Sequence, residues 1–227
     1  MSASRERVLV FDVNETLLDL AALDPHFARL FGDAKVRREW FGTMLQSALL
    51  FTVTGPYVDF GSHFRTALRQ TAERYRVTLS DEDEKAILGQ VRTLPPHPEV
   101  RESLERLRDA GFRLAALTNS TLAVEEAQLQ TAGLRDLFEA ALTADDAKRL
   151  KPAKEAYDKA AEKLGVPVAR IRLVAAHAWD VAGALRAGCA AAFVARPGAL
   201  WNPLIERPDI WGLDVRDVAD QIIARDR

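Results

Sequence analysis

The chain has 227 residues, 48% hydrophobic and 28% charged, which is enough for one sizeable core or for a core and a small second domain. Its formal net charge of -2 and the lack of basic runs interleaved with aromatic residues argue against a nucleic-acid partner. Cys189 is the single cysteine, and no apolar stretch approaches the length of a membrane span. We therefore expect a cytoplasmic globular protein with no membrane partner.

Short apolar runs that end at polar residues indicate strands buried on both faces of a parallel sheet. Such runs occur at 8–11, before Asp12, at 113–117, before Thr118, at 171–175, shortly before His177, and at 191–194. Apolar periodicity closed by a glycine predicts helices over 98–110, 122–132, 153–164 and 181–187. This alternation predicts an α/β fold with a Rossmann-like, doubly wound parallel sheet.

Residues 18–95 interrupt the alternation with a helical pattern, in which Phe41, Leu45 and Leu49 share one face, and the pattern ends at Pro95. We therefore expect a core domain of residues 1–17 and 96–227 and a helical cap domain of residues 18–95. The acidic run at 81–84 follows Ser80 and is typical of a capped helix start, so we assign it no chemistry.

Polar residues that follow the strands of an open parallel sheet meet in one crevice at the carboxyl ends of those strands. These residues include the parts of an active site. A carboxylate can act as a nucleophile, and a lysine can hold its negative charge. Hydroxyls and amides can bind an anion, and a second carboxylate can activate water. The residues are Asp12, Thr16, Thr118, Asn119, Ser120, Lys151, His177 and Asp180. No G-x-S-x-G, Walker or G-x-G-x-x-G motif occurs, which argues against serine-hydrolase and nucleotide-binding functions.

Four segments resemble the four motifs of the haloacid dehalogenase superfamily, in the same order. They are FDVNETL at 11–17, LTNS at 117–120, KP at 151–152 and HAWD at 177–180. The resemblance covers nearly the whole chain, including a helical cap inserted after the first strand.

The choice within the superfamily depends on two positions. Its phosphatases carry an acid two residues after the nucleophile and paired acids in the fourth motif that help to hold Mg²⁺, whereas this chain has Asn14 and His177. A halide leaving group needs no general acid, so the chain resembles the (S)-2-haloacid dehalogenase branch, which needs no metal or other cofactor. A superfamily phosphatase and a catalytically silent protein that binds a small carboxylate remain as alternatives.

The resemblance implies that Asp12 displaces halide from a short 2-haloacid, and that water then hydrolyses the aspartyl ester. The implied catalytic residues are Asp12, Thr16, Lys151, His177 and Asp180. The implied substrate-binding residues are Phe41, Phe60, Thr118, Asn119, Ser120, Tyr157 and Trp179, with Tyr157 completing the polar network. A homodimer is implied by the resemblance alone.

Some of these residues also have purely structural interpretations. Thr118 and Ser120 could be N-caps of the next helix, and Phe41, Phe60 and Trp179 could be core aromatics. Phe41 stands where the branch carries a cap arginine that meets the halide, and Arg37 and Arg38 are the nearest candidates to replace that arginine. His177, where relatives carry asparagine, could donate to halide, order the hydrolytic water or act as a base.

Overall fold

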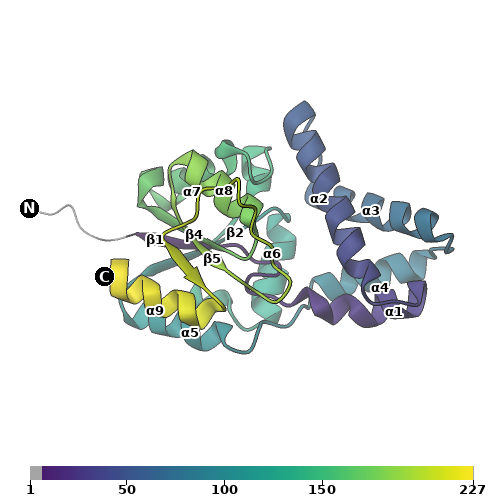
Figure 1. Cartoon of the computed structure of the whole chain (residues 1–227), viewed down its shortest axis with the longest axis horizontal. Helices are drawn as coiled ribbons and strands as arrows, with labels where there is room; N and C mark the ends of the chain where they lie inside the picture. The colour runs from purple at the N-terminus through teal and green to yellow at the C-terminus, as the bar shows by residue number, and fades with distance from the viewer. Residues whose placement is uncertain (1–6, 227) are drawn as a thin grey trace, which may run out of the picture.

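The computed structural model describes residues 7–226, and within them six parallel strands form one sheet in the order β3-β2-β1-β4-β5-β6 (Figure 1). The strands are β1 (Val8–Phe11), β2 (Arg113–Thr118), β3 (Ala140–Thr143), β4 (Ile171–Ala175), β5 (Ala190–Val194) and β6 (Ile210–Gly212). The strand order reverses at β1, which pairs with β2 on one side and with β4 on the other. Ligands of such sheets bind at the carboxyl ends of the strands beside this reversal.

Helices cover both faces of the sheet, which explains why β1 is apolar at every position. Val8 and Val10 pack in one cluster with α7 (Lys154–Leu164) and α8 (Ala178–Ala187). Leu9 and Phe11 point to the opposite face and pack in a second cluster with α5 (Val100–Asp109) and α9 (Val215–Asp226). Another helix, α6 (Leu122–Thr131), follows β2 and contacts β3.

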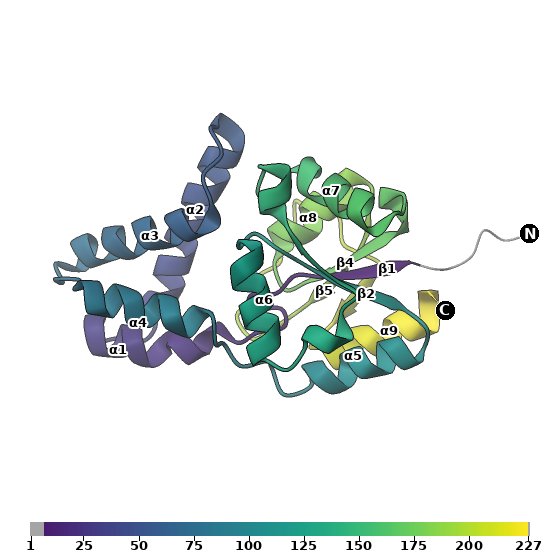
Figure 2. The same cartoon turned by 180° about the vertical axis from the view of Figure 1, so that it is seen from behind.

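A helical insertion lies beyond the carboxyl end of β1, to one side of the sheet (Figures 1 and 2). It consists of η1 (Leu20–Leu23), α1 (Asp24–Phe31), α2 (Val36–Thr54), α3 (Phe60–Tyr75) and α4 (Asp81–Val91). Trp40 is fully buried at its centre, with its ring 5.3 Å from Phe27 and 4.4 Å from Phe64. The expected N-cap of α4 is confirmed, because the Ser80 hydroxyl accepts a hydrogen bond from the Asp83 backbone N–H at 3.1 Å.

The chain enters and leaves this insertion at one place. Leu18 forms an antiparallel bridge with Pro96, the Asp19 backbone N–H donates to the Pro95 carbonyl at 2.8 Å, and the His97 N–H donates to the Leu17 carbonyl at 2.9 Å. The two connecting segments therefore lie side by side, only a few residues after the end of β1.

The predicted strands and helices of the sheet region are confirmed, with some omissions. β3, β6 and α9 were not predicted, because β3 and β6 are short edge strands without a distinctive apolar run. α8 begins at Ala178, three residues before the predicted start, because its first turn carries Trp179 and Asp180 rather than the periodic apolar residues. In residues 7–226 we find no helix with the length and apolar character needed to cross a membrane.

Candidate active site

Lys151 links two carboxylates at the carboxyl ends of β1 and β4. Its Nζ atom lies 2.9 Å from Oδ1 of Asp12 and 2.6 Å from Oδ2 of Asp180, and it also donates to the Leu117 carbonyl at 2.8 Å. The Lys151 side chain is completely buried. Because an ammonium group has three N–H donors, these three acceptors fix its position between Asp12 and Asp180.

Thr16 holds the other oxygen of Asp12. Its hydroxyl donates to Asp12 Oδ2 at 2.6 Å and accepts from the Ala176 backbone N–H at 2.9 Å. Thr16 is fully buried because the turn after β1 folds back, with the Leu17 N–H donating to the Val13 carbonyl. The Asp12 carboxylate is therefore oriented by a hydrogen bond on each oxygen, from Lys151 to Oδ1 and from Thr16 to Oδ2.

Tyr157 supports Asp180 from behind. Its hydroxyl donates to Asp180 Oδ1 at 2.6 Å, and both side chains are buried. Tyr157 thus joins the polar network, as predicted, but it lines neither of the two cavities described below, so the implied substrate contact is not found. Tyr157 lies on the buried, apolar face of α7, which packs against α8, so its hydroxyl reaches Asp180 rather than the cavity above Asp12.

His177 lies between two acids. Its Nδ1 atom is 3.3 Å from Asp12 Oδ2, and its Nε2 atom is 2.9 Å from Glu15 Oε2. Glu15 has a φ of 62°, in the left-handed region that non-glycine residues rarely occupy. Glu15 is not among the predicted site residues, although an acid within the first motif and a histidine in the fourth could have suggested the pair.

The charges of this cluster shift the pKa values of its members. Burial alone would raise the pKa of Asp12, but the charge of Lys151, with His177 and Thr16, lowers it far below its ordinary value. Burial opposes the charge of His177, but the carboxylates of Asp12 and Glu15 outweigh it and raise the His177 pKa to about 10. Asp12 is therefore ionised and His177 is cationic at neutral pH.

The pKa values of Asp180 and Lys151, which lie behind Asp12, are also shifted. Burial raises the pKa of Asp180, although the charge of Lys151 partly opposes this effect. Burial disfavours the Lys151 ammonium, but Asp12 and Asp180 outweigh it and raise the pKa of Lys151. Lys151 is consequently a permanent cation, and Asp180 is the more easily protonated of the two carboxylates.

Three aromatic rings form a stack beside Asp12. The His177 ring lies between Phe41, with centroids 5.8 Å apart, and Trp179, with centroids 5.2 Å apart. Neither nearby arginine takes the place of the missing cap arginine at Asp12. Arg37 pairs with Asp24 at 2.5 Å and with Glu15 at 3.5 Å, and the Arg38 guanidinium lies beside Gly198.

A cavity of about 20 Å³ lies directly above Asp12. Its walls include five of the seven residues that were expected to bind substrate, namely Phe41, Phe60, Thr118, Asn119 and Trp179, together with His177, which was expected to be catalytic. Ser120 lines a larger neighbouring cavity of about 270 Å³ instead. Residues that the sequence analysis selected from the insertion and from the sheet region therefore line one cavity together.

The loop after β2 has a different role from the predicted helix cap. Thr121, not Thr118 or Ser120, occupies the N-cap position of α6, and the Thr118 hydroxyl accepts from the Ser120 N–H at 3.1 Å. The Asn119 amide accepts from the Lys151 backbone N–H at 2.7 Å and donates to its carbonyl at 3.2 Å. The N-cap interpretation was wrong, and Asn119 instead anchors the segment that carries Lys151.

Asn14 has its side chain held by a neighbouring amide, since Gln128 Nε2 donates to Asn14 Oδ1 at 3.0 Å. An amide in this position cannot supply a titratable proton. Within residues 7–226, no group of three or more histidine, cysteine, aspartate or glutamate side chains is arranged to hold a metal ion.

Comparison with known proteins connects this geometry to one family. Residues 6–188 match the family described as "Hydrolase: haloacid dehalogenase-like hydrolase". The (S)-2-haloacid dehalogenase 2 of Pseudomonas sp. (strain CBS-3) is 29% identical over 92% of this chain and 93% of its own. The (S)-2-haloacid dehalogenase of Xanthobacter autotrophicus is 30% identical over 84% of this chain and 75% of its own.

A solved structure has the same architecture over nearly its full length. The crystal structure of an L-2-haloacid dehalogenase superposes with a TM-score of 0.92 at 28% identity, covering 96% of this chain and 99% of that chain. The Rossmann-like sheet and the helical insertion are thus shared features.

Proposed function

We propose that this chain, which belongs to the haloacid dehalogenase-like hydrolases, converts short 2-haloacids into 2-hydroxyacids through a covalent ester on Asp12. The observation that carries the proposal is the fixed position of Lys151 Nζ, 2.9 Å from Asp12 and 2.6 Å from Asp180. This arrangement keeps Asp12 ionised as a nucleophile and holds a second carboxylate, Asp180, on the other side of the same ammonium group. The curated relatives that carry the name (S)-2-haloacid dehalogenase support the choice of substrate.

In the first step, an oxygen of Asp12 attacks carbon 2 of the substrate. A carbon–oxygen bond forms as the carbon–halogen bond breaks, and the halide leaves with the bonding electron pair. No proton has to be supplied, which suits the amide of Asn14 in this motif. Thr16 orients the nucleophile, and Thr118, Asn119 and Ser120 surround the substrate carboxylate.

His177 receives the departing halide in this proposal. Its Nδ1 atom has no hydrogen-bond partner among residues 7–226, although it lies 3.3 Å from Asp12 Oδ2. A cationic ring with a free N–H beside the nucleophile can stabilise an anion that forms there. Phe41 and Trp179 pack on its two faces and shield the anion from water.

In the second step, water attacks the carbonyl carbon of the Asp12 ester. Asp180 accepts a proton from the water, and its buried position and raised pKa suit that role. The acyl carbon–oxygen bond then breaks, the 2-hydroxyacid leaves with a proton on its new hydroxyl, and Asp12 regains a carboxylate oxygen from water. Tyr157 and Lys151 hold Asp180 in place during this step.

Residues 18–95 act as a cap domain in this proposal, over a core of residues 1–17 and 96–227, of which residues 1–6 and 227 lie outside the described range. Phe41 and Phe60 reach from the insertion into the cavity above Asp12. Excluding bulk water strengthens the electrostatic contacts inside a site. A cytoplasmic location is also part of the proposal, supported by the single, buried Cys189.

The test measures halide release from 2-chloropropanoate and bromoacetate without added metal, and phosphate release from a phosphomonoester with Mg²⁺. We expect halide release that is lost in Asp12→Asn, with the fold retained by circular dichroism. In a single turnover in ¹⁸O-labelled water, the label should enter Asp12 rather than the product. Phosphate release alone would favour the phosphatase, and label in the product hydroxyl would contradict the ester.

A further inference from the structure

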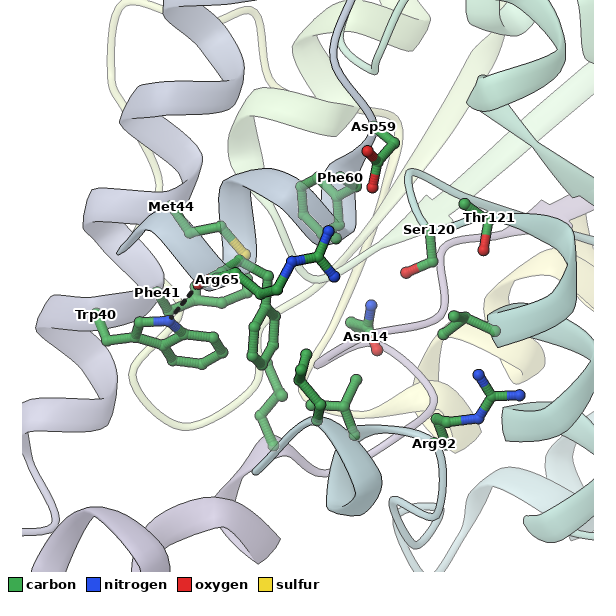
Figure 3. Close-up of a pocket in the computed structure, with 16 residues that line it drawn as sticks. Asn14, Trp40, Phe41, Met44, Asp59, Phe60, Arg65, Arg92, Ser120 and Thr121 are labelled. Atoms are coloured by element: carbon green, nitrogen blue, oxygen red, sulfur yellow. Dashed lines mark hydrogen bonds between the residues drawn. The ribbon is translucent and has the colours of Figure 1, made fainter. Parts of the chain in front are cut away.

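The cavity of about 270 Å³ lies between the helical insertion and the sheet region, beside the small cavity over Asp12. Figure 3 shows Trp40, Phe41 and Met44 on its insertion side and Asn14, Ser120 and Thr121 on the opposite side. Its wall includes Ser120, a proposed contact of the substrate carboxylate, but most of its volume lies beyond the chemistry at Asp12.

The two cavities share three wall residues, namely Asn14, Phe41 and Phe60. The small cavity, at about 20 Å³, has room for little more than one water molecule. A substrate whose carbon 2 reaches Asp12 therefore has to place any large substituent in the larger cavity, past Phe41 and Phe60.

The walls of the larger cavity favour an aromatic ring. Four aromatic side chains line it: Trp40, Phe41, Phe60 and Phe64. The rings of Trp40 and Phe64 meet edge to face with centroids 4.4 Å apart, an arrangement that a further ring can extend. A cavity of roughly 150 Å³ lined by apolar side chains is large enough to bind benzene, so this one has space for a phenyl group and its linking carbon.

The charged residues in the cavity wall are Asp59, Arg65 and Arg92. Arg65 crosses the cavity in Figure 3, with its guanidinium directed towards Asp59. The Arg65 side chain donates to Ser62 Oγ at 3.1 Å, and its charge contributes to the lowered pKa of Asp59, against the larger effect of burial. The guanidinium therefore lies near the Asp59 carboxylate within the cavity wall, where a planar cation can also lie on the face of an aromatic ring.

We propose that the preferred substrates are 2-haloacids whose carbon 2 carries an aryl-bearing side chain, and that this ring occupies the cavity lined by Trp40 and Phe64. The proposal rests on the proposed dehalogenation and extends it to a substrate class. The halogen and carbon 2 stay beside His177 and Asp12, the carboxylate reaches Ser120 in the wall of the larger cavity, and the aryl substituent occupies the rest of that cavity.

The first test compares kcat/KM for halide release from 2-bromo-3-phenylpropanoate and from 2-bromopropanoate. Each buried methylene is worth about a fourfold gain, so we expect the phenyl compound to be favoured by about tenfold or more. Equal or lower kcat/KM for the phenyl compound would overturn the proposal.

The second test fills the cavity away from Asp12. Val124 lines it from α6, and Val124→Phe is expected to lower kcat/KM for the phenyl compound by about tenfold while bromoacetate turnover changes by less than about twofold. Leu122→Phe is the matched control, because Leu122 lies on the same helix, is 45% exposed and is not part of the cavity wall. An equal loss for both substrates, or an equal loss in both variants, would contradict the assignment.

A binding measurement separates this proposal from the proposed chemistry. The affinities of 3-phenylpropanoate and propanoate, which carry no halogen, can be compared by titrating tryptophan fluorescence, because Trp40 lines the cavity. We expect the phenyl acid to bind at least about tenfold more tightly, and Val124→Phe to remove the difference. Tight phenyl binding without any halide release would contradict only the dehalogenation, whereas bromoacetate turnover without phenyl selectivity would contradict only the aryl pocket.

Discussion

The Oε2 atom of Glu15 lies 2.9 Å from Nε2 of His177, and this pair holds a cationic ring beside the Asp12 carboxylate. Glu15 adopts a φ of 62°, a conformation that costs a non-glycine residue about 1–2 kcal/mol. The ion pair with His177, and a longer one of 3.5 Å with Arg37, can offset that cost. Glu15 therefore connects the insertion, through Arg37, to the ring next to the nucleophile.

Replacing Glu15 with glutamine should lower the pKa of His177. In the wild-type protein, Asp12 and Glu15 together raise the His177 pKa to about 10 against the effect of burial. His177 contributes stability below its unfolded-state pKa, and that contribution is lost as the pH rises through about 10. In Glu15→Gln the loss of this stability should begin at lower pH. The fall in halide release at alkaline pH should also shift to lower pH.

The measurement for this variant is a titration of the histidine ring resonances by NMR, together with the pH profile of kcat/KM. Glu73→Gln serves as a control, because Glu73 is exposed on α3. A His177 titration that does not move in Glu15→Gln would contradict the coupling, even if activity fell.

Replacing Lys151 with methionine should abolish turnover and also destabilise the fold. The change leaves Asp12 and Asp180 buried without their shared cation, and breaking a buried ion pair in this way typically costs about 3–5 kcal/mol. Urea unfolding measures the loss. The double variant Lys151→Met/Asp180→Asn should recover part of the stability but none of the activity. A single variant as stable as the wild type would refute the electrostatic account.

A chelator should leave the activity unchanged. The Lys151 ammonium lies between Asp12 and Asp180, and His177 lies between Asp12 and Glu15, so cationic side chains already neutralise these carboxylates. The check is halide release after dialysis against EDTA, with and without Mg²⁺ added back. Loss on chelation with recovery on adding Mg²⁺ would require a different mechanism.

Replacing Glu125 with glutamine should alter the pH dependence of stability. Glu125 is fully buried on α6, neither carboxylate oxygen has a hydrogen-bond partner within residues 7–226, and burial raises its pKa well above 4.5 despite the charge of Lys151. The stability contributed by the neutral acid is present below the unfolded-state pKa and is lost as the pH rises through the folded-state pKa. The wild type should therefore lose stability relative to Glu125→Gln as the pH increases.

Urea unfolding at about pH 5 and about pH 9 measures this difference. Glu126→Gln is the neighbouring control, because Glu126 pairs with Arg135 at the surface and such pairs contribute little. Parallel pH profiles for the wild type and Glu125→Gln would show that Glu125 is already ionised in the folded protein.

Much of the fold could be predicted because the central strands carry an unbroken apolar signal. β1 and β4 are buried on both faces and end at polar residues, so periodicity and length identify them. β6 could not be predicted in this way, because it contains only three residues and is held in a strand conformation by its pairing with β5. Edge strands of this kind are determined by tertiary contacts rather than by local sequence.

The site could be predicted as a set of residues but not as a set of contacts. Asp12, Lys151 and Asp180 follow from their positions after strands and from the resemblance to a family. The residue types could have suggested the pair of Glu15 and His177, but its geometry depends on the left-handed backbone of Glu15, which the sequence does not signal. The separation of Ser120 from the small cavity likewise depends on where the insertion lies over the sheet.

The paired connecting segments at Leu18 and Pro96 form a short two-stranded joint between the insertion and the sheet region, which also meet through contacts such as the hydrogen bond from Tyr57 to Asp145. A tilt of the whole insertion has to pass through this short two-stranded joint, which is separated from Asp12 only by the turn that carries Glu15. A movement of the joint would therefore reach Asp12 through only a few residues. A bulky substrate that tilts the insertion would then shift Glu15 and the charged ring of His177, and so change the electric field at Asp12.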